Sequence, residues 1–308
     1  MYGPAGLATS LGRITLMLPD SRTLFKGDLS VARRTAWSQP LPLDDVKAVG
    51  RATGATVNDV IVASVAGALR RYMQGRGQAV EGVDVRAMIP VNIRTAEEAL
   101  EKLGNHFGLV VLSLPVGSAE PLDRLYELKR RMDHLKNTPE AYTTYGIVST
   151  IGMTPIQIER LVVRFFASKT SAVMTNVAGP RHKLYLAGNP IYQMNFWVPQ
   201  SAGIGLGISI FSYAGDVVVG VMANAKLVPD PETIVDAFQA EFAALQALIA
   251  HPADGQELRP NAVSDDGHGQ HGASDAHCQA LTKAGLPCKN PALPGSDTCR
   301  VHAGVLVA

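Results

Sequence analysis

Residues 54–73, GATVNDVIVASVAGALRRYM, predict a helix that is apolar along nearly its whole length. Apolar residues recur in it at helical spacing, which indicates burial: Val60, Ile61, Val65, Leu69 and Met73. At its start, Thr56 is placed as an N-cap with Asp59 three residues later, a variant of the capping box. Asn58 therefore lies where the helix dipole favours developing negative charge, at a helix end that we expect to face a cleft. On local pattern alone, a purely structural role for Asn58 and Asp59 is the alternative.

The composition is that of a folded and nearly neutral protein. The chain has 308 residues, 46% of them hydrophobic and 18% charged, which suffices for one large core or two smaller domains. A formal net charge of +1 and scattered basic doublets argue against a nucleic-acid partner. No window approaches the roughly 18 to 20 continuous apolar residues that cross a bilayer, and the amino terminus lacks a signal sequence, so we expect a cytoplasmic protein.

Strand-like and helical stretches interleave over residues 28–251, which predicts an α/β domain with a mixed sheet packed by helices. The opening residues 1–27 contain Gly and Pro and little periodicity, and we interpret them as an inter-domain connecting segment. The last helix is expected to have Asp230 as its N-cap and Pro231 at its first position. Residues 252–276 are polar and rich in Gly and Asp, which predicts a flexible linker.

Several separate motifs follow one another along the chain: GATVNDVIVASVAGALRRYM, MIPVNIRT, LGNHFGLVVLSLPVG, MTNVAGPRHKLYLAG, and GIGLGISIFSYAGDVVVGVMAN followed by VPDPETIVDAF. In this order they resemble the carboxyl-terminal half of the bacterial wax ester synthase/diacylglycerol acyltransferases, over nearly all of residues 10–250. The resemblance implies one half of a chloramphenicol-acetyltransferase-like, CoA-dependent acyltransferase, a fold in which two similar halves enclose a tunnel.

The resemblance also implies a reaction, in which a fatty acyl group passes from acyl-CoA to the hydroxyl of a long-chain alcohol or a diacylglycerol. This chemistry needs a base that takes the hydroxyl proton and donors that stabilise the oxyanion. In the family the base is a histidine of an HHxxxDG motif in the amino-terminal half, and none of the eight histidines of this chain stands in such a motif. Because loss of a general base costs roughly 10²- to 10⁴-fold in rate, we expect this chain alone to be weakly active or inactive.

By the same resemblance, Asn58 and Asp59 match the Asn-Asp motif of the family. Asn58 would orient the acceptor hydroxyl or donate to the oxyanion, and Asp59 would hold the start of the helix. The other matching segments contribute weaker substrate-binding candidates: Asn92, Arg94, Asn105, Thr175, Asn176 and Gly179. For Asn176 and Gly179 a tight turn is the alternative. His106 is disfavoured as a replacement base, since no partner is positioned for it.

The three cysteines all lie near the carboxyl terminus, in CQALTKAGLPCKNPALPGSDTCRVH. Three thiolates and an imidazole form a set that binds structural zinc, and its members are Cys278, Cys288, Cys299 and His302. Residues 277–304 are too few to build a stable core without a metal or a disulfide, and a reducing compartment favours zinc. The segment also resembles small modules with three cysteines and one histidine that are appended to bacterial proteins. Free thiols in a disordered tail are the alternative.

Three functions remain open. The leading one is an acyl-CoA-dependent O-acyltransferase that needs an amino-terminal half from another polypeptide, or a homo-oligomer, and that contacts acyl lipids at the periphery of a membrane or lipid droplet. The second is a non-catalytic acyl-lipid-binding or regulatory protein. The third is a scaffold, in which the zinc module recruits another protein.

Overall fold

The computed structural model of the chain describes residues 12, 16–93, 107–136, 138, 140–151, 156–200 and 203–251. All of them lie in one compact unit, Met1–Val263. Six of the predicted site residues are outside the described residues: Arg94, Asn105, Cys278, Cys288, Cys299 and His302. The predicted linker and zinc module therefore stay predictions.

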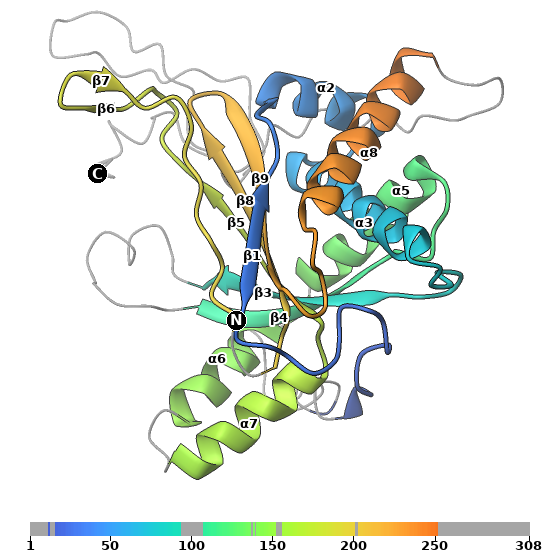
Figure 1. Cartoon of the computed structure of the whole chain (residues 1–308), viewed down its shortest axis with the longest axis vertical. Helices are drawn as coiled ribbons and strands as arrows, with labels where there is room; N and C mark the ends of the chain where they lie inside the picture. Colours follow the sequence, from blue (N-terminus) through green and yellow to red (C-terminus); the bar gives the residue numbers. More distant parts are fainter. Residues whose placement is uncertain are drawn as a thin grey trace, which may run out of the picture. The chain divides into compact units, whose positions relative to one another are not determined.

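A mixed sheet of seven strands lies at the centre of the described part of the chain (Figure 1). Its order is β1 (Arg33–Trp37), β9 (Asp216–Asn224), β8 (Leu206–Tyr213), β5 (Ala172–Ala178), β3 (Val85–Asn92) and β4 (Phe107–Leu114), with β2 (Leu41–Pro42) also paired to β9. Strands β3, β5 and β8 are parallel, and the other pairs are antiparallel. The carboxyl ends of β3, β5 and β8 therefore meet at one end of the sheet. A separate hairpin joins β6 (Tyr185–Leu186) to β7 (Asn189–Pro190).

Four helices pack together beside the sheet: α2 (Leu43–Thr53), α3 (Val57–Gly75), α5 (Pro121–Lys136) and α8 (Glu232–Ala250) (Figure 1). Helix α3 lies in the middle and contacts the other three. Every residue from Asp59 to Met73 except Arg71 is buried. The prediction of a helix buried along its length is confirmed, and so is the α/β class with a mixed sheet.

A buried ion pair joins α5 and α8 across α3. Arg124 of α5 and Glu241 of α8 form a salt bridge, and their side chains are only 2% and 6% exposed. Arg71 of α3 pairs with the same carboxylate from a more exposed position. The pair passes over Gly67 of α3, where a Cβ would collide with both charged groups. A glycine is therefore required at the point where the three helices meet.

Helix α6 (Glu140–Ile151) covers the outer edge of β4. The hydroxyl of Thr144 accepts from the Leu109 N–H at 2.8 Å and donates to the Leu109 carbonyl at 2.7 Å. The carboxylate of Glu140 accepts from the Val111 N–H at 3.2 Å. Side chains of a helix thus satisfy backbone groups that an edge strand would otherwise present to solvent.

The start of α8 differs from the prediction. The helix begins at Glu232 with Pro231 as its N-cap, and Asp230 makes no capping bond to the helix backbone through its side chain. The Asp230 carboxylate instead accepts from the Tyr72 hydroxyl at 2.7 Å and pairs with Arg76. Burial and this hydrogen bond raise the pKa of Tyr72 well above its usual value. Asp230 therefore ties the carboxyl end of α3 to α8.

The expectation that no segment is long and apolar enough to cross a bilayer needs amendment. By length and composition α8 qualifies, and α2 with α3 would qualify together but for a bend of 96° between them. The apolar face of α8 is buried against the core, including Ile234, Phe238 and Phe242. Core helices of this kind meet the same criteria, so the finding gives weak support for a membrane span.

Part of the opening segment packs onto the domain. Phe25 is buried and stacks on Tyr72 with their ring centroids 5.9 Å apart. Asp20 accepts from the Arg86 N–H at 3.0 Å and from the Ser171 hydroxyl at 2.6 Å. The described residues before β1 are thus held by strands β3 and β5 and by helix α3. That residues 1–27 connect two domains stays a prediction.

The contact over Gly67 leads to a stability prediction. In Gly67→Ala, the new Cβ would force Arg124 and Glu241 apart, which should lower the free energy of unfolding by about 2–3 kcal/mol. Gly75→Ala is the matched control, because it lies in the same helix with open space around it and should be neutral or slightly stabilising. Urea unfolding of both variants measures the difference. Equal stabilities would show that α3 can shift to accommodate the methyl group.

Candidate functional site

The amino end of α3 is held by the predicted capping box. Thr56 has extended backbone angles, and its hydroxyl accepts from the Asp59 N–H at 3.2 Å. In return, the Asp59 carboxylate accepts from the Thr56 N–H at 2.9 Å. Asp59 is completely buried, so its carboxylate faces the protein rather than the surface. Its place in the structure is that of a residue which fixes the first turn of the helix.

Asn58 points away from this cap, toward the sheet. The side-chain amide of Asn176 in β5 donates to the Asn58 Oδ1 at 3.0 Å. This bond leaves the Asn58 amide N–H groups without a partner among the described residues. Since these N–H groups lie at the positive end of the α3 dipole, they can donate to an oxygen that gains negative charge.

The surroundings of the two asparagines combine polar and apolar groups. Asn176 lies near the carboxyl end of β5, and Asn92 lies at the carboxyl end of β3, which is parallel to it. Large apolar side chains at this end of the sheet remain unusually exposed, with fractions of 38 to 42%: Val91, Phe107 and Val177. Phe107 enters this group because it pairs with Asn92 across β3 and β4. The candidate site thus has amide donors beside an apolar rim, as an acyl ester would require.

Thr175 and Gly179 take different positions. Thr175 is next to Asn176 in β5, so its side chain projects from the opposite face of the strand. Gly179 approaches β8 closely, and a Cβ there would collide with the Phe211 ring and the Ser212 carbonyl. Packing against β8 therefore explains the glycine without a substrate.

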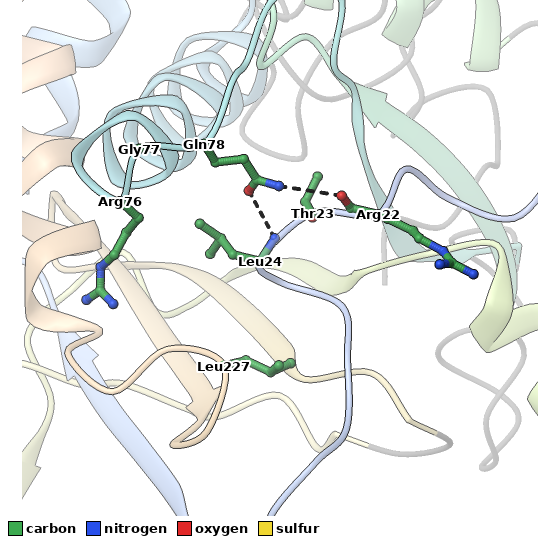
Figure 2. A pocket seen from close by; sticks show the side chains of 7 residues that line it. All are labelled: Arg22, Thr23, Leu24, Arg76, Gly77, Gln78 and Leu227. Carbon is green, nitrogen blue, oxygen red and sulfur yellow. Dashed lines mark hydrogen bonds between the residues drawn. The ribbon is translucent and has the colours of Figure 1, made fainter.

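Among the described residues, a pocket of about 450 Å³ opens at the carboxyl end of α3, the opposite end from Asn58 (Figure 2). Gln78 spans one wall, where its side chain accepts from the Leu24 N–H at 3.0 Å and donates to the Arg22 carbonyl at 3.4 Å. Arg76, on another side, is paired with Asp230. These polar groups serve each other, so the pocket does not compete with the Asn58 end as the reactive site. The described residues contain no cluster of His, Cys, Asp or Glu that could hold a metal ion.

Two family models match the sequence. The model described as the WS/DGAT C-terminal domain matches residues 103–246. The model described as the wax ester synthase/diacylglycerol acyltransferase catalytic domain matches residues 5–61, a segment that includes Asn58 and Asp59.

Curated relatives give the same result. A putative diacylglycerol O-acyltransferase of Mycobacterium tuberculosis is 29% identical over 246 residues, which cover 77% of this chain and 53% of that protein. A putative diacylglycerol O-acyltransferase of Mycobacterium bovis is 26% identical over 249 residues, which cover 79% of this chain and 52% of that protein. The chain thus spans about half the length of the curated relatives it matches.

Solved structures show the fold. A wax ester synthase/diacylglycerol acyltransferase from Marinobacter aquaeolei superposes with a TM-score of 0.58 at 22% identity, covering 82% of this chain and 58% of that chain. The EpoB cyclization-docking bidomain of a nonribosomal peptide synthetase from Sorangium cellulosum superposes with a TM-score of 0.52 at 16% identity, covering 80% and 48%. The chain has the mixed α/β fold of these proteins, and its sequence matches support the wax ester synthase/diacylglycerol acyltransferase family.

Proposed function

We propose that this chain contributes the carboxyl-terminal half of an acyl-CoA-dependent O-acyltransferase, which esterifies a diacylglycerol or a long-chain alcohol in the cytoplasm. The observation that carries the proposal is the hydrogen bond between Asn176 and Asn58 at the amino end of α3. The matching family models and relatives give the reaction class. The apolar rim formed by Val91, Phe107 and Val177 supplies a surface for an acyl chain.

In this proposal Asn58 stabilises the reaction's negative charge. Attack of the acceptor hydroxyl on the thioester carbonyl forms a tetrahedral intermediate, whose oxygen takes up an electron pair. The Asn58 N–H groups donate to that oxygen, and Asn176 keeps them oriented by occupying the Asn58 Oδ1. Asp59 acts one step further away, because its bond to the Thr56 N–H fixes the helix end that carries Asn58.

The proton acceptor comes from the missing half. This chain has no HHxxxDG motif, so a histidine of an amino-terminal half must take the hydroxyl proton. We propose that this half, on another polypeptide or on a second subunit, meets the chain at the end of the sheet that holds Asn58. Acyl-CoA and the acceptor lipid would then bind between the two halves.

Reconstitution tests this division of labour. Transfer from palmitoyl-CoA to hexadecanol or to a diacylglycerol is measured with the chain alone, and after mixing with an amino-terminal half from a relative that contains HHxxxDG. Ester formed only on mixing is the expected result. Ester formed by the lone chain would mean that it holds its own base, and no ester in either case would favour a binding or scaffold protein.

Within the reconstituted enzyme, Asn58→Ala should lower kcat by about 10²- to 10³-fold, because one donor to the oxyanion is lost. The free energy of unfolding should change by less than about 0.5 kcal/mol, since Asn58 does not take part in the cap. Gln74→Ala is the matched control: it removes an exposed amide from the other end of the same helix and should leave kcat unchanged. Equal kcat for both variants would remove Asn58 from the mechanism.

We also propose that residues 277–304 bind structural zinc through Cys278, Cys288, Cys299 and His302. Metal analysis of the purified protein under reducing conditions should find about one zinc ion per chain, and Cys299→Ser should lose it. Acyl transfer by the reconstituted enzyme should be unaffected, because four protein ligands leave no open position on the metal. A ratio near zero in the unmodified protein would exclude the zinc site.

A further inference from the structure

Helix α7 (Ile156–Ser168) exposes much of its apolar surface. It makes no extended contact with the other helices and strands of the described part of the chain (Figure 1). Five large apolar side chains on it are 36 to 69% exposed: Ile156, Ile158, Leu161, Val163 and Phe165. Ile158, Leu161 and Phe165 are spaced by three and four residues, so they form one row along the helix. We call this row the α7 stripe.

Positive charge runs beside the α7 stripe. Arg160 and Arg164 are exposed and four residues apart, and helical geometry places both on the flank next to Leu161. Neither arginine has an ion-pair partner among the described residues. An apolar row bordered by unpaired arginines is complementary to a surface with negative charge above an apolar interior.

The carboxyl end of α7 is anchored to the domain. The Ser168 carbonyl accepts from the Asp20 N–H at 3.2 Å and also from the Lys26 ammonium. The Lys169 ammonium lies 4.5 Å from the centre of the Phe165 ring and donates to the Met17 carbonyl. Whatever binds the stripe is thereby connected to β5, which begins at Ala172 and carries Asn176 near its other end.

The size of the stripe separates two kinds of occupant. Its exposed apolar side chains offer a few hundred Å², about half of the roughly 800 Å² that each partner buries in a stable protein interface. A symmetric contact with a second copy would also bring the two arginines of each chain together, and like charges repel. A single helix that lies flat in a bilayer surface needs no larger area, because lipid accommodates its shape.

We propose that α7 docks the protein on a membrane rich in anionic phospholipid. The helix lies parallel to the surface, with the stripe in the boundary between headgroups and acyl chains and with Arg160 and Arg164 at the phosphates. The inference draws its purpose from the proposed function, whose acceptor is a lipid. Its test is separate, because it measures binding and not acyl transfer.

Sedimentation of the full chain with vesicles tests the proposal. Binding to vesicles of phosphatidylcholine with phosphatidylglycerol is expected, with much weaker binding to phosphatidylcholine alone and a decrease at high salt. Leu161→Gln should weaken binding about tenfold or more, since it removes a buried leucine from the lipid. The double variant Arg160→Gln/Arg164→Gln should weaken it by roughly 30-fold, at about fivefold per charge.

The matched control is Leu186→Gln on the β6–β7 hairpin. Leu186 is 72% exposed and Leu161 is 69% exposed, so the two changes remove similar apolar surface from different places. Leu186→Gln should bind vesicles as the unmodified protein does, and thermal unfolding should be the same for all variants. Absence of vesicle binding overturns the proposal, as does an equal loss in both leucine variants. A dimer that Leu161→Gln dissociates would instead assign the stripe to a second copy.

Discussion

The contact of Glu241 with Arg124 over Gly67 sets the position of α3, and the reactive end of the domain depends on that position. A charge pair removed from water is favourable only when its geometry is well maintained, so three helices are held to one arrangement at this point. Asp230 repeats the principle at the far end of α3, where it receives Tyr72 and Arg76. The helix is therefore fixed along its axis and about it.

A fixed α3 delivers Asn58 to the end of β5. The sheet contributes Asn176 at the carboxyl end of one of its parallel strands, and the helix contributes its positive end, so two independent elements converge on one amide group. Neither element holds a proton acceptor there among the described residues. The geometry suits a domain that stabilises charge while a second domain moves the proton, and this division agrees with a chain that spans half of its relatives.

Much of the fold is predictable from local patterns. The helix Pro121–Lys136 follows from its leucine spacing, and the β8–β9 turn follows from Ala214 and Gly215, which both have positive φ. Contacts between distant segments are not predictable in this way. Asn58 and Asn176 are 118 residues apart, and nothing in either motif indicates that they meet. Asp230 is misassigned for a related reason, because its partners lie on another helix.

The covering of β4 by α6 has a consequence for the life of the polypeptide before it finds any partner. Thr144 and Glu140 occupy the backbone groups that an incoming extended peptide would need. Newly synthesised copies that collide in a crowded cell therefore find no template for cross-β growth on this side of the sheet.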